Sequence, residues 1–206
     1  MNVRKKLLCS AVATVAIGGF SVSAANAALI QEVAGSAEVN NYVIPTNNDY
    51  APLVGTVGTL GGSLEAVGTD PIKLTFEYLF KEAGYINTFN FGGTEVFNTS
   101  SSGAGDTYST IWNGGAGLLD FKFTVNSGSG NVTNAGNDGT ANANFFMASA
   151  GMDSFYLLLD DSGAGPDDNH DDLILKVTAS KVPEPGTLAL LGLGLAGLAL
   201  RFKAKK

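Results

Sequence analysis

One stretch of nine residues constrains the fold more than any other part of this chain. In IKLTFEYLF, residues 72–80, the apolar side chains occupy every second position, with polar or smaller partners between them: Ile72, Leu74, Phe76, Tyr78 and Phe80. A period of two places alternate side chains on opposite faces of a strand, whereas a helix would spread these residues around its axis. The stretch therefore predicts a strand with one face, including Phe80, buried in a core.

The same alternation recurs in LDFKFTV, residues 119–125, where Leu119, Phe121, Phe123 and Val125 are predicted to point inward. Further strands are predicted at 85–91, 107–112, 142–148, 154–160 and 172–179, and weak ones near 41–45 and 53–60. Glycine- and asparagine-rich turn signals separate them, as at Gly92-Gly93 and 113–115. No stretch has a convincing amphipathic helical pattern. The sequence predicts an all-β protein, specifically an antiparallel β-sandwich.

The N-terminal residues have the pattern of a secretory signal peptide. Three basic residues at positions 4–6 precede an apolar run over 7–22, and the small residues Ala25 and Ala27 follow. We expect signal peptidase to cut after Ala27. The only cysteine of the chain, Cys9, would be lost with this peptide, so the exported part is predicted to fold without disulfides.

The C-terminal residues contain three successive features. The sequence Val182-Pro183-Glu184-Pro185 is followed by an uncharged run over 186–200, and then by a basic cluster: Arg201, Lys203, Lys205 and Lys206. As a helix, the uncharged run would reach roughly 22 Å, which is less than a hydrocarbon core of about 30 Å. The basic end should stay in the cytoplasm and leave the body of the chain outside. These features predict a short transmembrane helix that is held transiently in the inner membrane.

This order of features resembles the PEP-CTERM sorting signal of Gram-negative bacteria. The resemblance implies recognition and processing by a membrane exosortase near Val182-Pro183-Glu184-Pro185. It also implies delivery to the cell surface or to an extracellular matrix such as that of a biofilm, commonly alongside exopolysaccharide. A weaker resemblance over residues 74–177 links the body to the β-rich bodies of many such proteins.

The expected organisation is a signal peptide (1–27), a secreted β-sandwich domain (28–181) and a sorting signal (182–206). Between residues 28 and 182 there are five lysines, no arginine and eighteen acidic residues, a net charge of −13. Such a surface repels nucleic acid and favours cations, neutral polysaccharide or simple solvation.

The stretch LLLDDSGAGPDDNHDDLIL, residues 157–175, is the one most suited to binding chemistry. It gathers oxygen ligands of the kind that Ca²⁺ prefers: Asp160, Asp161, Asp167, Asp168, Asn169, Asp171 and Asp172. The alternation at 167, 169 and 171 is similar to the first half of an EF-hand loop, but the central glycine and the final glutamate are missing. Two interpretations stay open: a calcium site, or a solvated loop whose charges protect strand edges.

The other candidate residues give weaker signals. His170, the only histidine, is predicted to be exposed and made more basic by its neighbours. Trp112 could stack on a sugar ring or close one end of the core. No catalytic residue is predicted, since the exported part contains no cysteine and no nucleophile motif.

We therefore expect a non-enzymatic surface or matrix protein, with calcium as a candidate stabiliser of the 160–172 loop. The alternative is a module that binds extracellular polysaccharide through Trp112 and neighbouring tyrosines. A carboxylate-dependent glycoside hydrolase is the third hypothesis.

Overall fold

A computed structural model describes residues 27–33, 37–39, 51–53, 57–82, 84–126, 130–137, 143–162, 170–183, 186 and 191–195. Over these residues the protein is an antiparallel β-sandwich, as the alternating sequence predicts. Most of the predicted signal peptide, with Ala25, lies outside the described residues. So do the weak strand predicted at 41–45 and the basic cluster at 201–206.

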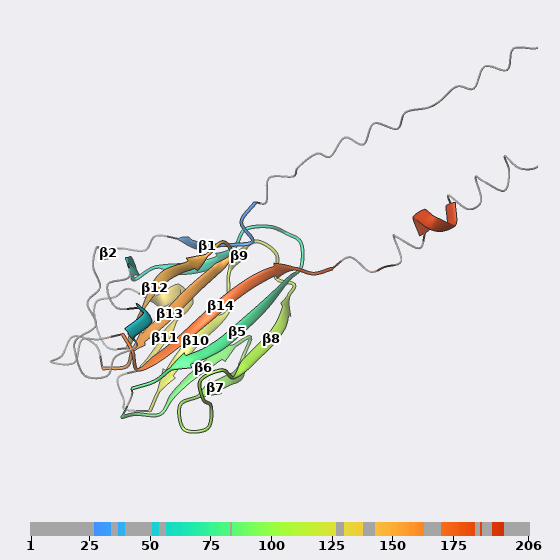
Figure 1. Ribbon diagram of the computed structural model, residues 1–206. Coiled ribbons are helices and arrows are strands. Elements are labelled where there is room, and N and C mark those ends of the chain that lie inside the picture. Colours follow the sequence, from blue (N-terminus) through green and yellow to red (C-terminus); the bar gives the residue numbers. More distant parts are fainter. Residues whose placement is uncertain are drawn as a thin grey trace, which may run out of the picture.

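One layer of the sandwich is a seven-stranded sheet (Figure 1). Its order is β2 (Ala37–Val39), β3 (Gly58–Leu60), β12 (Asn144–Gly151), β13 (Ser154–Asp160), β14 (Leu173–Lys181), β5 (Ile72–Phe80) and β8 (Thr107–Trp112). Every pairing is antiparallel. The last strand in the sequence, β14, therefore lies inside the sheet, between β13 and β5.

Two smaller sheets pack against one face of this layer. The four-stranded sheet has the order β11 (Asn131–Thr133), β10 (Phe121–Val125), β6 (Asn87–Phe91) and β7 (Thr94–Asn98). The three-stranded sheet has the order β1 (Ile30–Val33), β4 (Ser63–Ala66) and β9 (Gly117–Leu118). Two short 3₁₀ segments, η1 (Ala51–Leu53) and η2 (Asn134–Gly136), accompany the strands. A single core cluster joins residues of all three sheets.

The centre of that core is a group of aromatic rings from both layers. Phe89 of β6 lies 5.1 Å from Phe76 and 5.3 Å from Phe123, measured between ring centroids. Phe145 of β12 lies 5.5 Å from Phe121 and 5.6 Å from Phe123. Rings at these separations in tilted arrangements add to the free energy of burial. The inward residues predicted at 119, 121, 123 and 125 are all buried.

Phe80 departs from the alternation that predicted its side chain on the inner face. The pairing of β14 with β5 shifts between Ile174 and Leu175, so that Ile174 lies opposite Phe80 and Leu175 opposite Tyr78. This irregularity inserts Leu79 as an extra residue, and a bulge of this kind turns the following side chain to the other face. Phe80 accordingly packs against a second apolar cluster on the outer face of the large sheet: Leu53, Phe146, Ala148, Leu158 and Ile174.

Two buried asparagines link the sheets where strand pairing ends. The Asn134 side chain accepts a hydrogen bond from the Leu64 amide at 2.8 Å and donates to the carbonyls of Leu64 and Leu119. Asn137 accepts from the Phe145 amide and donates to the Phe145 and Gly62 carbonyls. Each amide supplies partners that a neighbouring strand would otherwise provide, which satisfies buried backbone groups.

The predicted strands match the described ones closely at 72–80, 107–112 and 154–160, which coincide with β5, β8 and β13. The segments at 85–91, 119–125, 142–148 and 172–179 overlap β6, β10, β12 and β14 with shifted ends. At the predicted Gly92-Gly93 turn both residues have positive φ, 57° and 77°, as a tight hairpin between β6 and β7 requires.

Candidate functional site

Two regions at opposite ends of β14 carry the sequence features that pointed to function. Residues 160–162 and 170–172, with Asn87 and Asn144, form the first, which we call the acidic end. The second lies where the chain leaves the sandwich after Lys181 (Figure 1). A nine-residue strand separates them, a length of roughly 27 Å at about 3.3 Å per residue.

At the acidic end the four described aspartates are buried rather than solvated. Asp160 and Asp171 have no exposed surface, Asp161 retains 3% and Asp172 retains 9%. Asp160 accepts hydrogen bonds from the amide of Ser162 at 2.9 Å and from Nδ2 of Asn144 at 3.4 Å. These contacts close a turn at the end of β13, a common role of aspartate in loops.

Asp161 and Asp172 connect the ends of three strands. Nδ2 of the fully buried Asn87, at the start of β6, donates to Oδ2 of Asp161 at 2.6 Å. The Asp161 amide donates to Oδ2 of Asp172 at 2.8 Å. Asp161 therefore links β6 of the smaller sheet to the end of β13, and Asp172 links the neighbouring ends of β13 and β14 in the large sheet.

His170 does not occupy the exposed position that the sequence predicted. Its imidazole retains 2% exposure, lies near Phe146, and has Nε2 at 2.6 Å from Oδ1 of Asn144. Because Nδ2 of Asn144 faces the Asp160 carboxylate, Oδ1 is the atom facing the imidazole, and Nε2 carries the proton. Burial lowers the pKa of His170 to about 3, which keeps the ring neutral at physiological pH. The expected increase in basicity is thus reversed by desolvation.

The remaining candidate calcium ligands, Asp167, Asp168 and Asn169, lie outside the described residues. Among the described residues, no group of three or more histidine, cysteine, aspartate or glutamate side chains is arranged to hold a metal ion. Asp160, Asp161 and Asp172 accept hydrogen bonds within the protein. A calcium site at this loop would therefore also need ligands from residues 167–169.

Trp112, the candidate sugar platform, is partly buried against the main core. Its ring lies 6.0 Å from Phe91 in an edge-to-face arrangement, and Nε1 donates to the Gly115 carbonyl at 2.9 Å. Gly114 lies so close to the ring that an added Cβ would come within 2.3 Å of it. The indole is thus held between its own turn and the core, while Tyr85, earlier in the chain, is 49% exposed.

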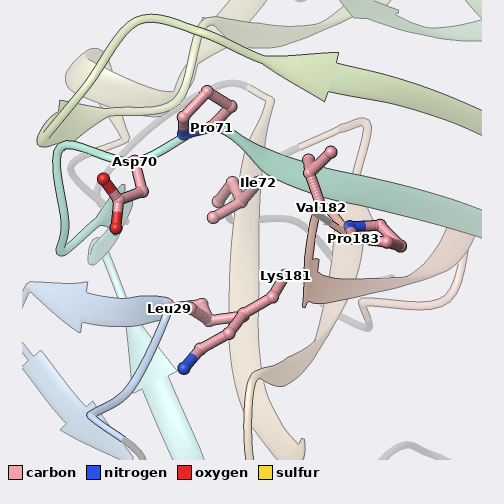
Figure 2. A pocket seen from close by; sticks show the side chains of 7 residues that line it. All are labelled: Leu29, Asp70, Pro71, Ile72, Lys181, Val182 and Pro183. Carbon is pink, nitrogen blue, oxygen red and sulfur yellow. The ribbon is translucent and has the colours of Figure 1, made fainter. Parts of the chain in front are cut away.

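The second region is a groove where the chain leaves the sandwich. A cavity of about 460 Å³ is lined by residues from the start of β1, the turn before β5 and the end of β14: Leu29, Asp70, Pro71, Ile72, Lys181, Val182 and Pro183 (Figure 2). We call it the exit groove. Val182 and Pro183 are the first residues of the predicted sorting signal, so that signal forms part of the wall.

The other predicted processing site lies beside the same groove. Ala27 and Ala28, which flank the predicted signal peptidase bond, are exposed. Leu29 is held by its amide, which donates to Oδ1 of Asp153 at 2.5 Å, and by its carbonyl, which accepts from Val67 at 3.0 Å. The segment that would begin the exported chain is therefore anchored next to the segment that ends it. This proximity has no local sequence signal, because residues 29, 70 and 181 are far apart in the chain.

Glu184 and Pro185 lie outside the described residues. Further along the tail, residues 191–195 are helical, and Leu191, Leu193 and Leu195 are 60–72% exposed. Among the described residues, no helix has the length and apolarity needed to span a membrane.

The fold and the tail define a class of protein: an all-β domain followed at once by an apolar C-terminal segment. Comparison with known families identifies that segment, since residues 181–205 match the model of the PEP-CTERM protein-sorting motif. The chain thus carries a PEP-CTERM sorting motif, and the motif implies export, sorting to the cell surface and an exosortase as the processing partner. A search of curated proteins finds no match.

Proposed function

We propose that this protein is a non-enzymatic component of the cell surface or of the extracellular matrix, released from its tail by exosortase processing. One observation carries the proposal. The sorting motif begins at Lys181, the last paired residue of a strand inside the large sheet. A folded sandwich is therefore the cargo that the motif delivers, and no separate linker domain stands between them.

The surroundings of the candidate catalytic and binding residues support a structural role. The one histidine is buried and neutral at physiological pH, although a general base must reach its substrate and have a pKa near the operating pH. Asp160, Asp161 and Asp172 are engaged with backbone and asparagine donors. These groups hold strand ends together.

The sorting part is tested by replacing Pro183, Glu184 and Pro185 together with alanine in the producing cell. We expect the unaltered protein in the surface or matrix fraction, and the variant in the inner membrane fraction. A variant with three alanines at 100–102, in an exposed turn, is the matched control and should sort normally. Equal distribution of all three proteins would contradict the proposal.

We also propose that Ca²⁺ stabilises the loop through Asp167, Asp168 and Asn169. Carboxylate and amide oxygens are the preferred ligands of Ca²⁺. The proposed site lies outside the aspartates whose oxygens already accept hydrogen bonds within the protein. Thermal unfolding of the full chain should show a gain of about 2.7 kcal/mol at a calcium concentration 100 times the dissociation constant. The gain should vanish in an Asp167→Ala, Asp168→Ala variant. It should persist in Glu95→Ala, Asp120→Ala, which removes the same charge from exposed sites elsewhere. A calcium response equal in the two variants would contradict this proposal.

Polysaccharide binding is kept as the alternative function, with Tyr85 as the most exposed aromatic side chain among the described residues. Under our proposal, the protein is not retained on the producer's own polysaccharide. Retention that is lost in Tyr85→Ala would favour the alternative, and release of reducing sugar would indicate a hydrolase.

A further inference from the structure

We propose that the exit groove is a docking surface for the exosortase, so that the enzyme recognises the folded domain together with the motif. This inference rests on the proposed function, because it takes the exosortase as the partner that acts on the tail. It adds a second recognition element, built from residues distant from the motif in the sequence.

The exit groove lies within reach of an enzyme that acts on the motif. Lys181 still pairs with Ile72 in the sheet, and Val182 and Pro183 already line the groove. At about 3.3 Å per extended residue, the chain can place Pro183 at most about 7 Å and Pro185 at most about 13 Å beyond the last paired residue. A single α-helix is about 10–12 Å across with its side chains. An enzyme that acts near these prolines must therefore contact the groove and its rim.

The exit groove also has a surface chemistry suited to a protein partner. The side chains of Leu29, Pro71 and Ile72 form an apolar wall, while Asp70 and Lys181 are exposed and carry opposite charges. An apolar centre bounded by charged groups is the usual composition of a protein interface. A cavity of about 460 Å³ has room for a few side chains of a partner.

The groove depends on a completed fold. Leu29 is held in position by the bond of its amide to Asp153, by the bond of its carbonyl to Val67 and by packing against the main core. Asp70 and Pro71 are positioned by the turn that enters β5, next to β14. Because three separate segments must be in place, docking at this surface selects cargo that has already folded.

The test measures the rate at which the basic tail is removed from the full chain, by pulse labelling and mass analysis in cells that contain the exosortase. In Asp70→Arg we expect the rate of processing to fall about threefold to tenfold, as charge reversal at an interface rim slows association. The matched control is Glu95→Arg, an exposed position on β7 of the other layer, which should be processed at the normal rate. A second variant inserts six Gly and Ser residues between Lys181 and Val182, which separates an intact groove from the motif and should also slow processing.

Slower processing in either variant, with Glu95→Arg unaffected, supports docking at the exit groove. Normal rates in both variants would overturn it, as would equal slowing in Glu95→Arg. The outcome for the unaltered protein separates the two proposals. If it keeps its tail at the cell surface, the proposed function itself is wrong, whereas normal processing of all variants removes only the docking surface.

Discussion

The two ends of β14 differ in a way that the sequence alone does not reveal. The acidic end has the residues on which catalytic and metal sites are usually built, yet its described aspartates and its histidine are buried. Asp160, Asp161, Asp172 and His170 are hydrogen-bonded within the protein. The exit groove is lined mainly by apolar side chains, and its charged rim residues, Asp70 and Lys181, are exposed. Reactive residue types therefore hold strand ends together at one end, while a surface suited to a partner forms at the other.

The cause of this difference is the route of the chain. Asp161 and Asp172 lie at the ends of neighbouring strands, where backbone amides and the Asn87 side chain need acceptors. At the other end the last strand has to leave the sheet, so the packing around Ile72 and Val182 stays incomplete. Buried polar groups require hydrogen-bond partners, whereas an apolar surface whose packing is interrupted remains open as a groove.

The largest expected effect concerns His170 and pH. Its pKa is about 3 in the folded protein and about 6.5 when unfolded, so the unfolded state binds a proton first as the pH falls. Stability should therefore be full above about pH 6.5 and decline between pH 6.5 and 3, by up to about 1.4 kcal/mol per pH unit. In a chelator, denaturant unfolding at pH 7 and pH 4 should show a loss of about 3 kcal/mol due to this residue.

The matched variant for that measurement is His170→Gln, whose side-chain amide can still donate to Asn144 but cannot titrate. Other groups contribute equally to both proteins, so the difference between their pH profiles isolates the imidazole. Identical profiles would show that the ring is accessible to protons in the folded state, and the two ends would then be less different than we describe.

The next effect concerns the bond between Asn87 and Asp161. Asp161→Ala removes the acceptor of a fully buried amide donor, which should cost about 1–3 kcal/mol in the free energy of unfolding. Asp161→Asn retains an oxygen at this place and should cost less. At the exit groove, Asp70→Ala changes an exposed side chain and should stay within about 0.5 kcal/mol. Chemical denaturation measures all three, and a cost for Asp70→Ala equal to that of Asp161→Ala would contradict the contrast between the ends.

The smallest effect concerns Asp153, which supports the groove from the β12–β13 hairpin. Its φ is 57°, a left-handed conformation that aspartate and asparagine tolerate better than most residues. Asp153→Ala should lose the bond to the Leu29 amide and about 1 kcal/mol of stability, with faster amide exchange in β1. Asp153→Asn keeps both the acceptor and the backbone preference, so its exchange should be close to normal. Unchanged exchange in the alanine variant would show that β1 is anchored without this bond.

Much of the fold could be predicted because it depends on local patterns. The alternation in β5, β8 and β13 and the glycine pair after β6 are each visible in a few neighbouring residues. The strands β1, β4, β7 and β11 were not predicted, since they are three to five residues long and carry few alternating positions. The side of Phe80 was predicted wrongly, because the bulge at Leu79 exists only through pairing with β14.

The candidate sites also divide into features with a local sequence signal and features without one. The sorting motif is a contiguous pattern and could be recognised in the sequence. The burial of His170 depends on Asn144 and Phe146, which lie more than twenty positions away in the sequence. Likewise the exit groove unites residues 29, 70–72 and 181–183, and the bridging role of Asn134 depends on a strand seventy residues earlier. Contacts over such separations leave no local signal.

The most direct test of the central claim is the intact mass of the protein recovered from the surface or matrix of the producing cells. The account predicts a chain that begins at Ala28 and ends near Pro183–Pro185, with the segment from Leu191 to Lys206 absent. In cells without the exosortase, the same measurement should show the tail still attached. A surface protein that retains Arg201–Lys206 in normal cells would contradict the account and make the C-terminal segment a permanent anchor.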